Sequence, residues 1–395
     1  MTPGARTQAA IELLDEIVAA AASGGAAADT LIARYFATRR YAGSKDRRAV
    51  RELVYAAIRL AGPVPASGRA AMVALADIDP AVAATFDGEG HGPAPIRSNE
   101  PRAERGVAPD WLVEALAESG LDERQQGALV GRAPLDIRVN SLATNREAVL
   151  EQWPEASPTP HAPLGLRLPN GTAVEASDIY RAGLVEVQDE GSQLVGAALN
   201  AQPGEWLVDL CAGAGGKTLQ IAAAMANQGT LLACDIDRAR LQRLAPRAER
   251  AGATIVESRL LNPGRETEML ADWASKADGV LIDAPCSGTG TWRRNPEARW
   301  RLTPERLARL SDMQRQVLEV GATLVKPGGR LVYIVCSLLD AEGTDQVATF
   351  LAGHPGWSTL PVEPAIGSSH GLGQRLDPAT HGTDGFFVAC LRAPC

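Results

Sequence analysis

VLIDAPCSGTG (residues 280–290) and LVYIVCS (residues 331–337) each combine a run of apolar residues with a cysteine at or just after its end. Short apolar runs bounded by Gly, Pro or Ser predict buried strands. From residue 203 onward such runs alternate with helical patterns, which predicts an α/β fold with a doubly wound parallel sheet. Ligands of these sheets bind at the carboxyl ends of the strands. If the two strands are neighbours, Cys286 and Cys336 project into the same crevice.

The other elements of this sheet follow from the same alternation. We expect strands at residues 205–210, 230–235, 253–257, 279–285, 330–336 and 385–391, the last of them at an edge. The expected helices cover residues 218–225, a segment ending near residue 251, residues 304–325 and residues 342–351. The string KPGG (residues 326–329) is expected to end the long helix.

The first half of the chain is organised differently. Apolar residues recur at helical spacing from about residue 6 to residue 76, and residues 87–106 are rich in Gly, Pro and charge. A helix at 110–119, strand-like runs at 133–142, 164–168 and 184–188, and a capping box of Thr144 and Glu147 follow. We therefore predict an all-helical domain (1–86), a linker (87–106), a small α+β module (107–183) and the doubly wound domain (184–395).

Composition restricts the class of protein. The 395 residues are 45% hydrophobic and 22% charged, as in an ordinary soluble globular protein. No apolar run is long enough to span a bilayer and the N-terminus lacks a signal-peptide core, so we expect a cytoplasmic monomer. The six cysteines include no CxxC pair and no accompanying His cluster, which argues against a metal site and, in a reducing compartment, against disulfides.

The net charge of −8 argues against bulk attraction to nucleic acid, yet two stretches are basic. Between residues 31 and 60, Asp46 and Glu52 are outnumbered by Arg34, Arg39, Arg40, Lys45, Arg47, Arg48, Arg51 and Arg59. This stretch is either a solvated helical surface or a patch that contacts phosphates. Residues 288–310 interleave arginines, including Arg293 and Arg294, with Trp292 and Trp300. They suit a single-stranded RNA path or a helix start with buried tryptophans.

The string DLCAGAGGKT (residues 209–218) is a glycine-rich turn between a strand and a helix. A dinucleotide fingerprint fails because Thr218 stands where the third glycine is required. A phosphate-binding GxxxxGK[ST] loop requires glycine at Cys211, although GGKT still resembles it. An S-adenosylmethionine loop remains, in which Asp235, at the end of the second strand, accepts hydrogen bonds from ribose hydroxyls. A turn without a ligand is the alternative.

The cysteine pair suits one particular chemistry. Carbon 5 of cytosine becomes nucleophilic when a thiolate adds to carbon 6 and the ring is protonated at nitrogen 3, and the thiolate must later be expelled. Asp283, Cys286 and Cys336 supply an acid and two thiols at the ends of two strands. An amino-group methyltransferase would show a string like DPPY instead of DAPC. The alternative is a pair of buried structural cysteines, and spacing alone does not decide which cysteine attacks.

Six strings, PLDIRVN, VQDEGSQLV, DLCAGAGGKT, LIDAPCSGTGTWRRNP, YIVCSLL and DGFFVA, occur in this order. Over residues 107–395 the chain therefore resembles the NOP/Sun-type RNA (cytosine-5) methyltransferases, which have a Rossmann-like fold. SKDRRAVRELVYAAIR (residues 44–59) resembles the NusB-like RNA-binding domain. The combination is similar to the bacterial 16S rRNA methyltransferase B type, which implies 16S rRNA as the partner and 5-methylcytosine as the product.

The resemblance implies a role for each candidate residue. Cys336 would be the nucleophile, and Cys286 would assist proton removal or enzyme release. Asp283 would lie between cofactor and target base, and Asp235 would bind the ribose. The implied S-adenosyl-L-methionine loop consists of Cys211, Ala212, Gly213, Ala214, Gly215, Gly216 and Lys217. Lys217 would reach the methionine carboxylate or the target nucleotide.

The chain departs from the family pattern at one position that matters. Members have an aspartate after the third strand that contacts the adenine side of the cofactor, and here Ser258 occupies that place, next to Glu257. Ala214 also replaces a common proline. We expect an RNA cytosine-5 methyltransferase that acts on 16S rRNA. The rivals are a tRNA methyltransferase with the same centre and a non-catalytic RNA-binding assembly factor.

Overall fold

The computed structural model describes residues 1–363 and 365–395, and these pack into two compact units. The first unit consists of Met1–Arg132 and Thr291–Pro304. The second consists of Ala133–Gly290 and Glu305–Cys395. A short piece of chain from the second half of the sequence therefore belongs to the N-terminal unit. The domain boundaries expected after residues 86, 106 and 183 remain predictions.

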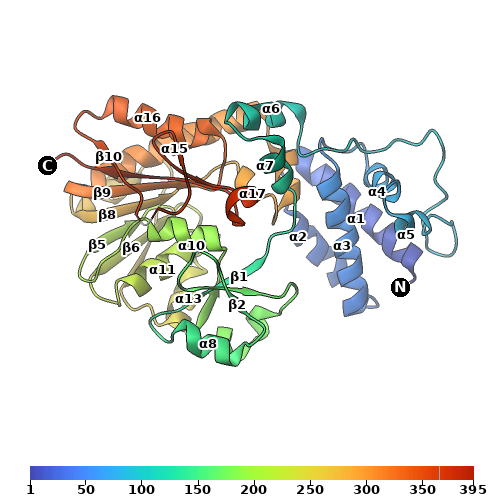
Figure 1. Cartoon of the computed structure of the whole chain (residues 1–395), viewed down its shortest axis with the longest axis horizontal. Coiled ribbons are helices and arrows are strands. Elements are labelled where there is room, and N and C mark those ends of the chain that lie inside the picture. The colour runs from blue at the N-terminus through green and yellow to red at the C-terminus, as the bar shows by residue number, and fades with distance from the viewer. Residues whose placement is uncertain (364) are drawn as a thin grey trace. The chain divides into compact units, whose positions relative to one another are not determined.

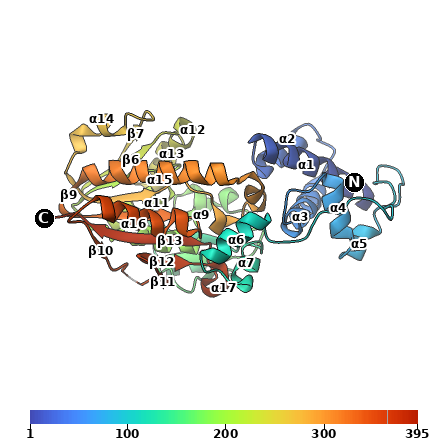
Figure 2. The ribbon, with the colours of Figure 1, turned by 90° about the horizontal axis from the view of Figure 1, so that it is seen from above.

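The first unit is helical, as the spacing of apolar residues predicts. Its helices are α1 (Pro3–Ser23), α2 (Ala28–Ala37), α3 (Ser44–Leu60), α4 (Gly68–Ala76), α5 (Pro80–Ala83), α6 (Asp110–Glu118) and α7 (Glu123–Ala128). Leu13, Leu14 and Ile17 of α1 are fully buried and share one apolar core with Val54 and Ile58 of α3. In Figure 2 helices α1 to α5 form one group.

The piece contributed by the second half of the chain carries the 3-10 helix η4 (Pro296–Arg301), and η3 (Thr289–Thr291) lies at its boundary. Arg299 is fully buried and donates hydrogen bonds to the carbonyls of Ile58 and Ala61, at 2.6 and 2.7 Å. Trp300 donates to the carbonyl of Gly62 at 3.0 Å. The end of a helix leaves its last carbonyls without hydrogen-bond donors. The side chains of Arg299 and Trp300 donate hydrogen bonds to carbonyls near the end of α3 and directly after it. The burial of Trp300 agrees with the alternative of buried tryptophans, whereas the burial of Arg299 was not predicted.

The second unit begins with a small antiparallel sheet in the order β2–β3–β1–β4. Its elements are β1 (Leu135–Val139), α8 (Arg146–Gln152), β2 (Ser157–Pro158), β3 (Gly165–Leu168), η1 (Val174–Ala176), α9 (Asp178–Arg181) and β4 (Val185–Val187). The predicted strands are confirmed. The predicted capping box is wrong, because α8 begins one residue later and the side chain of Asn145, not Thr144, accepts a hydrogen bond from the backbone of Ala148 at 2.9 Å.

The large sheet has the strand order β11–β12–β13–β9–β8–β5–β6–β7, and β10 pairs with β13. Its strands are β5 (Trp206–Asp209), β6 (Thr230–Asp235), β7 (Val256–Leu260), β8 (Ala277–Asp283), β9 (Val325–Val335), β10 (Ser358–Leu360), β11 (Ser368–His370), β12 (Gly373–Leu376) and β13 (Phe386–Arg392). Strands β7, β6, β5, β8 and β9 are parallel, and β13 is antiparallel to β9. The strand order reverses between β5 and β8, which is where such sheets bind ligands.

Helices cover both faces of the large sheet. Figure 1 shows α15 and α16 on one side of it and α10, α11 and α13 on the other. The helices are α10 (Glu190–Ala197), α11 (Gly216–Ala224), α12 (Arg238–Leu241), α13 (Leu244–Ala251), α14 (Glu266–Met269), η2 (Ala271–Trp273), α15 (Pro304–Leu324), η5 (Asp340–Glu342), α16 (Thr344–Gly353) and α17 (Pro378–His381). This arrangement confirms the predicted doubly wound α/β fold.

Three predicted strand positions are wrong. Strand β7 begins and ends three residues later than residues 253–257. The string KPGG lies inside β9. The pairing of β9 with β8 accommodates these residues by a register shift between Ala277 and Gly279. Strand β13 is not an edge strand, because the hairpin β11–β12 pairs with it. That hairpin is short and polar and therefore lacks the apolar pattern that predicts a strand.

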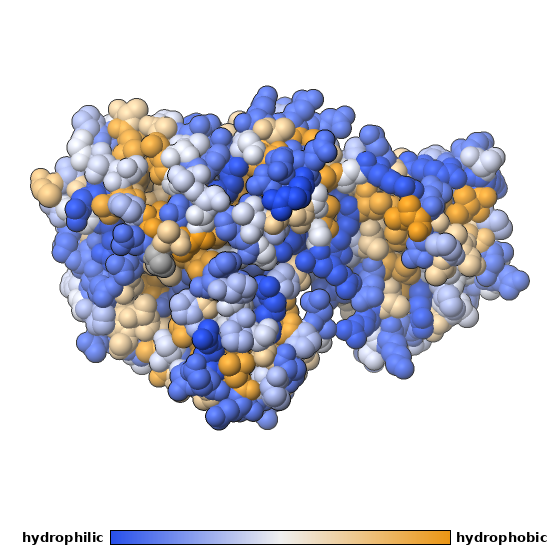
Figure 3. All heavy atoms as spheres, viewed as in Figure 1, coloured by the Kyte–Doolittle hydropathy of each residue, from blue (hydrophilic) through white to orange (hydrophobic). Residues whose placement is uncertain are grey.

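No helix in the described parts of the chain combines the length and the apolar character that crossing a membrane requires. The face of the molecule in Figure 3 is covered mainly by hydrophilic residues, with hydrophobic residues scattered between them.

Candidate active site

Three neighbouring strands end at the same edge of the large sheet. Strand β5 ends at Asp209, β8 ends at Asp283, and β9 ends directly before Cys336. In the pairing register Asp209 lies opposite Leu281, and Asp283 lies opposite Ile334. The two strands that precede the cysteines, β8 and β9, are therefore neighbours, as predicted, and the strand order reverses between β8 and β5.

The two cysteines face one another. The Sγ atoms of Cys286 and Cys336 are 3.2 Å apart, which is hydrogen-bonding distance for thiols, and both side chains are partly exposed. The hydrogen bond with Cys336, together with burial, raises the pKa of the Cys286 thiol well above its ordinary value. Cys286 is therefore held as a neutral thiol beside the sulfur of Cys336.

A buried ion pair lies next to the cysteines. The Nζ atom of Lys217 is 2.6 Å from Oδ2 of Asp283. Burial alone would lower the pKa of the Lys217 ammonium, but the Asp283 carboxylate outweighs burial and the pKa is raised. The ammonium is also close enough to Cys336 to interact with it electrostatically. A cation near a thiol stabilises the thiolate.

The glycine-rich turn connects β5 to the N-terminus of α11. Gly213 and Gly215 have φ angles of 56° and 87°, a left-handed conformation that favours glycine. A Cβ atom on Gly215 would also lie 2.1 Å from a side-chain carbon of Leu244. Burial raises the pKa of the Cys211 thiol well above its ordinary value, so this cysteine is not a reactive thiolate. Ala212, Ala214 and Gly216 complete the turn.

Asp235, at the end of β6, holds the glycine turn from the other side. Its Oδ2 accepts a hydrogen bond from the backbone of Gly213, and its Oδ1 accepts one from Asp237, each at 2.7 Å. Ser258 does not follow the third strand, because β7 continues to Leu260. Leu260, and not Ser258, lies opposite Asp235 in the register.

The carboxylate of Asp209 is almost completely buried beneath the turn. Its Oδ2 accepts a hydrogen bond from the hydroxyl of Thr218 at 2.6 Å. Its Oδ1 has no hydrogen-bond partner among the described residues. Burial raises the pKa of this carboxyl to about 7. A buried oxygen without a partner is costly, which points to a ligand group that completes the site.

The two arginines expected to contact RNA follow Cys286 within eight residues. Arg293 is only 7% exposed, and Arg294 is half-buried. Both lie in the piece of chain that packs with the first unit. Their contact with RNA stays a prediction.

A buried carboxylate that the sequence did not single out supports the loop after Cys286. Glu342, in η5, is fully buried, and its Oε1 accepts hydrogen bonds from the backbone of Ser287 at 2.8 Å and from the amide of Gln314 at 2.9 Å. Its Oε2 accepts a hydrogen bond from the hydroxyl of Ser287, whose oxygen lies 3.2 Å from the hydroxyl oxygen of Ser337. Ser287 and Ser337 directly follow the two cysteines, so Glu342 positions both of them.

Replacing Glu342 by alanine is expected to lower the free energy of unfolding by about 3 kcal/mol, because buried donors on Ser287 and Gln314 lose their acceptor. We also expect a methyl-transfer rate reduced at least tenfold, since the cysteine loops lose their support. Urea unfolding and single-turnover kinetics measure the two effects. Asp345→Ala, a change at an exposed carboxylate three residues away, serves as the control. Equal stability and rate in both variants would contradict the role of Glu342.

Nowhere in residues 1–363 and 365–395 do three or more His, Cys, Asp or Glu side chains gather in a way that could hold a metal ion. The site thus consists of two thiols, an ion pair, and carboxylates around a glycine-rich turn.

Comparison with solved structures identifies the fold. A methyltransferase homolog from Pyrococcus horikoshii is 26% identical with a TM-score of 0.60, and the match covers 72% of this chain and 99% of that one. The crystal structure of PH0851 gives a TM-score of 0.79 at 26% identity and covers 99% of both chains. The α/β unit therefore has the Rossmann-like fold of methyltransferases.

The family follows from the sequence comparisons. The family model described as 16S rRNA methyltransferase RsmB/F matches residues 196–392. A probable ribosomal RNA small subunit methyltransferase B from Synechocystis sp. is 38% identical over 300 residues, which is 72% of this chain and 66% of that protein. The match thus spans slightly less than two thirds of the relative. The chain belongs to the RsmB/F family, which confirms the resemblance recognised in the sequence.

Proposed function

We propose that this protein transfers a methyl group from S-adenosyl-L-methionine to carbon 5 of a cytosine in RNA, and that the RNA is 16S rRNA. The observation that carries the proposal is the pair of thiols, Cys286 and Cys336, 3.2 Å apart at the ends of adjacent strands. Transfer to an amino group or a ribose needs no protein nucleophile. Carbon 5 of cytosine, by contrast, reacts only after a thiolate has added to carbon 6.

The residues around β5 and β6 suit S-adenosyl-L-methionine, which supplies an electrophilic methyl group when it is bound. Each oxygen of Asp235 accepts one backbone hydrogen bond and keeps a lone pair for a ribose hydroxyl. The unpartnered Oδ1 of Asp209 suits the ammonium of the methionine end. The turn from Cys211 to Lys217 would enclose that end, and the N-terminus of α11 favours its carboxylate. Ser258 is left out because it lies inside β7.

Cys336 is the nucleophile in this proposal. The Lys217 ammonium lies near its sulfur, whereas Cys286 is held as a neutral thiol by its hydrogen bond with Cys336 and by burial. The sulfur of Cys336 forms a bond to carbon 6 while the Lys217–Asp283 pair delivers a proton to nitrogen 3. The electron pair of the carbon 5–carbon 6 double bond thereby becomes available at carbon 5, which takes the methyl group.

Cys286 completes the cycle. Its pKa is raised chiefly by the hydrogen bond with Cys336, and this cause disappears once the Cys336 sulfur is bonded to carbon 6. Cys286 then releases its thiol proton to solvent more readily, and the resulting thiolate accepts the proton that leaves carbon 5. The electrons of that carbon–hydrogen bond restore the carbon 5–carbon 6 double bond and expel the Cys336 thiolate, and nitrogen 3 loses its proton.

Incubation of the protein with 16S rRNA and methyl-labelled S-adenosyl-L-methionine is expected to place the label on carbon 5 of cytosine. Bisulfite sequencing of the product identifies the position, and total RNA from cells with and without the gene identifies the natural target. RNA incubated without protein is the control. A 5-methylcytosine found only in tRNA would replace the proposed substrate, and a label on an amino group or ribose would overturn the proposed chemistry.

A further inference from the structure

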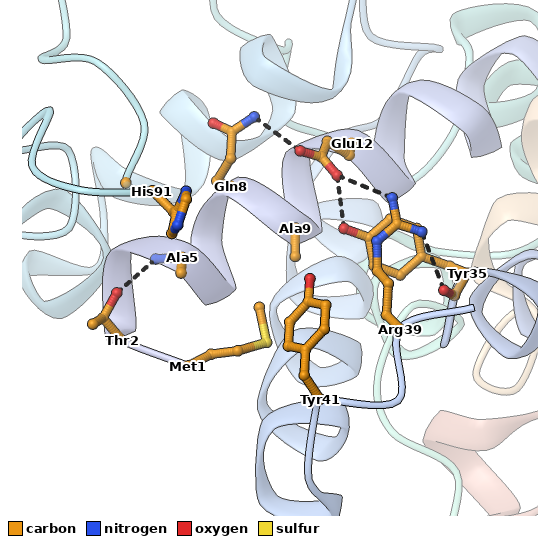
Figure 4. Close-up of a pocket in the computed structure, with 11 residues that line it drawn as sticks. Met1, Thr2, Ala5, Gln8, Ala9, Glu12, Tyr35, Arg39, Tyr41 and His91 are labelled. Carbon is orange, nitrogen blue, oxygen red and sulfur yellow. Dashed lines mark hydrogen bonds and ion pairs between the residues drawn. The ribbon is translucent and has the colours of Figure 1, made fainter. Parts of the chain in front are cut away.

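The first unit contains a pocket that the proposed chemistry does not use. It has a volume of about 790 Å³ and is lined by α1, the end of α2, the turn before α3, and the segment at His91. Figure 4 shows Glu12 between Gln8 and Arg39, with the ring of Tyr41 pointing toward α1. All of these residues belong to the first unit, so the pocket is complete within it.

The carboxylate of Glu12 is the fixed acceptor of this pocket. Its Oε2 accepts a hydrogen bond from the hydroxyl of Tyr35 at 2.7 Å and lies 3.7 Å from the guanidinium of Arg39. Its Oε1 accepts a long hydrogen bond, 3.5 Å, from Gln8. The side chain is 44% exposed, and a carboxylate oxygen can accept two hydrogen bonds. Glu12 therefore has free acceptor capacity that faces a ligand.

Flat surfaces lie beside this acceptor. The guanidinium of Arg39 lies 3.5 Å from the centre of the Tyr35 ring, which fixes the plane of both groups. Burial and the hydrogen bond to Glu12 raise the pKa of Tyr35, so its hydroxyl remains a donor to the carboxylate. The ring of Tyr41 is 73% exposed. Aromatic rings and guanidinium planes are the surfaces on which unstacked RNA bases stack.

The charges around the pocket decide the class of ligand. A carboxylate at the centre repels a phosphate and attracts donor groups. The exposed cations of the turn and of the first part of α3, namely Arg40, Lys45 and Arg48, would repel a basic peptide but attract the phosphates on either side of a base. An RNA base whose edge donates hydrogen bonds satisfies both requirements.

We propose that this pocket binds a single unstacked guanine of the RNA, with the Glu12 carboxylate accepting hydrogen bonds from its N1–H and 2-amino groups and Tyr41 stacking on its ring. Guanine is the base that offers two adjacent donors on its Watson–Crick edge, as a carboxylate requires, whereas adenine and cytosine offer one. The proposal rests on the proposed function, in which RNA is the substrate. It adds a contact specific for one base, made by residues distant in sequence from the two cysteines.

The test measures binding of five-nucleotide RNAs to the full chain at one fixed salt concentration. All positions are uridine except the central one, which is guanine, adenine or inosine, and the absence of cytosine keeps the target base out of the catalytic crevice. We expect guanine to bind about 5- to 150-fold more tightly than adenine. Inosine, which lacks the 2-amino group, should lie between the two.

Matched variants assign this preference to the pocket. Glu12→Gln should reduce the preference for guanine over adenine at least fivefold, whereas Glu16→Gln removes the same charge one turn further along α1 and should bind like the unaltered protein. Tyr41→Ala should weaken the binding of all three RNAs about fivefold or more, and Tyr41→Phe should retain it. The side chain of Tyr41 is exposed, so the two changes at this position leave the fold intact.

Three results would overturn the proposal: equal binding of the guanine and adenine RNAs, equal behaviour of Glu12→Gln and Glu16→Gln, or an arginine-rich peptide that binds through Glu12 in place of RNA. Methyl transfer to 16S rRNA is measured with the same preparation. Transfer without a guanine preference would reject the pocket and leave the proposed function intact. A guanine preference without methyl transfer would support the pocket and reject the proposed function.

Discussion

Replacing Cys336 by alanine is expected to abolish methyl transfer, with a loss on the order of 10⁴-fold or more, because carbon 5 of cytosine has no other route to nucleophilicity. The sulfur of Cys336 follows β9 directly and lies near the Lys217 ammonium. Binding of S-adenosyl-L-methionine should be unchanged, since Cys336 is not one of the predicted cofactor residues. Transfer of labelled methyl groups and calorimetric cofactor binding measure the two properties.

The same variant should also form no covalent complex with RNA. RNA that contains 5-fluorocytosine at the target traps such complexes, because the fluorine cannot leave as a proton does, and denaturing gel electrophoresis detects them. Cys395→Ala, which removes an exposed thiol, is the control and should behave like the unaltered protein. A covalent complex formed by Cys336→Ala would show that the nucleophile is a different residue.

The centre of the site could be predicted because its residues follow strongly apolar strands. The runs before Asp283 and Cys336 are long enough to be recognised as buried strands, and parallel strands of this type end at one edge. Their pairing puts the two cysteines together. The position of Asp235 was predictable for the same reason, since β6 has the expected bounds. Which cysteine attacks came from the family resemblance and not from this pattern.

The parts that the sequence did not reveal depend on contacts between distant residues. Glu342 lies in a polar segment that resembles a helix start, yet it is bound to Ser287, 55 positions away. Arg299 looked like one more basic residue, but it is buried against carbonyls of α3, more than 230 positions earlier. Strand β7 is short and half-exposed, so its bounds had little apolar signal, and Ser258 was placed wrongly as a result.

Replacing Cys286 by alanine is expected to have the opposite effect on the covalent complex from Cys336→Ala. The nucleophile is still present and the methyl group can still be transferred, but the base that removes the proton from carbon 5 is missing. The bond between Cys336 and carbon 6 then persists. Ordinary RNA, without 5-fluorocytosine, should accumulate as a complex with this variant that survives denaturing electrophoresis, and turnover should stop after a single event.

The outcome separates the two thiols more sharply than loss of activity does, because both alanine variants are expected to be inactive. A double variant, Cys286→Ala with Cys336→Ala, should form no complex, since the bond needs Cys336 whatever happens to Cys286. The reverse pattern, in which Cys336→Ala traps RNA and Cys286→Ala does not, would exchange the two roles. The direction of one pKa shift argues against that exchange: the hydrogen bond with Cys336 and burial raise the pKa of the Cys286 thiol, which disfavours Cys286 as the attacking thiolate.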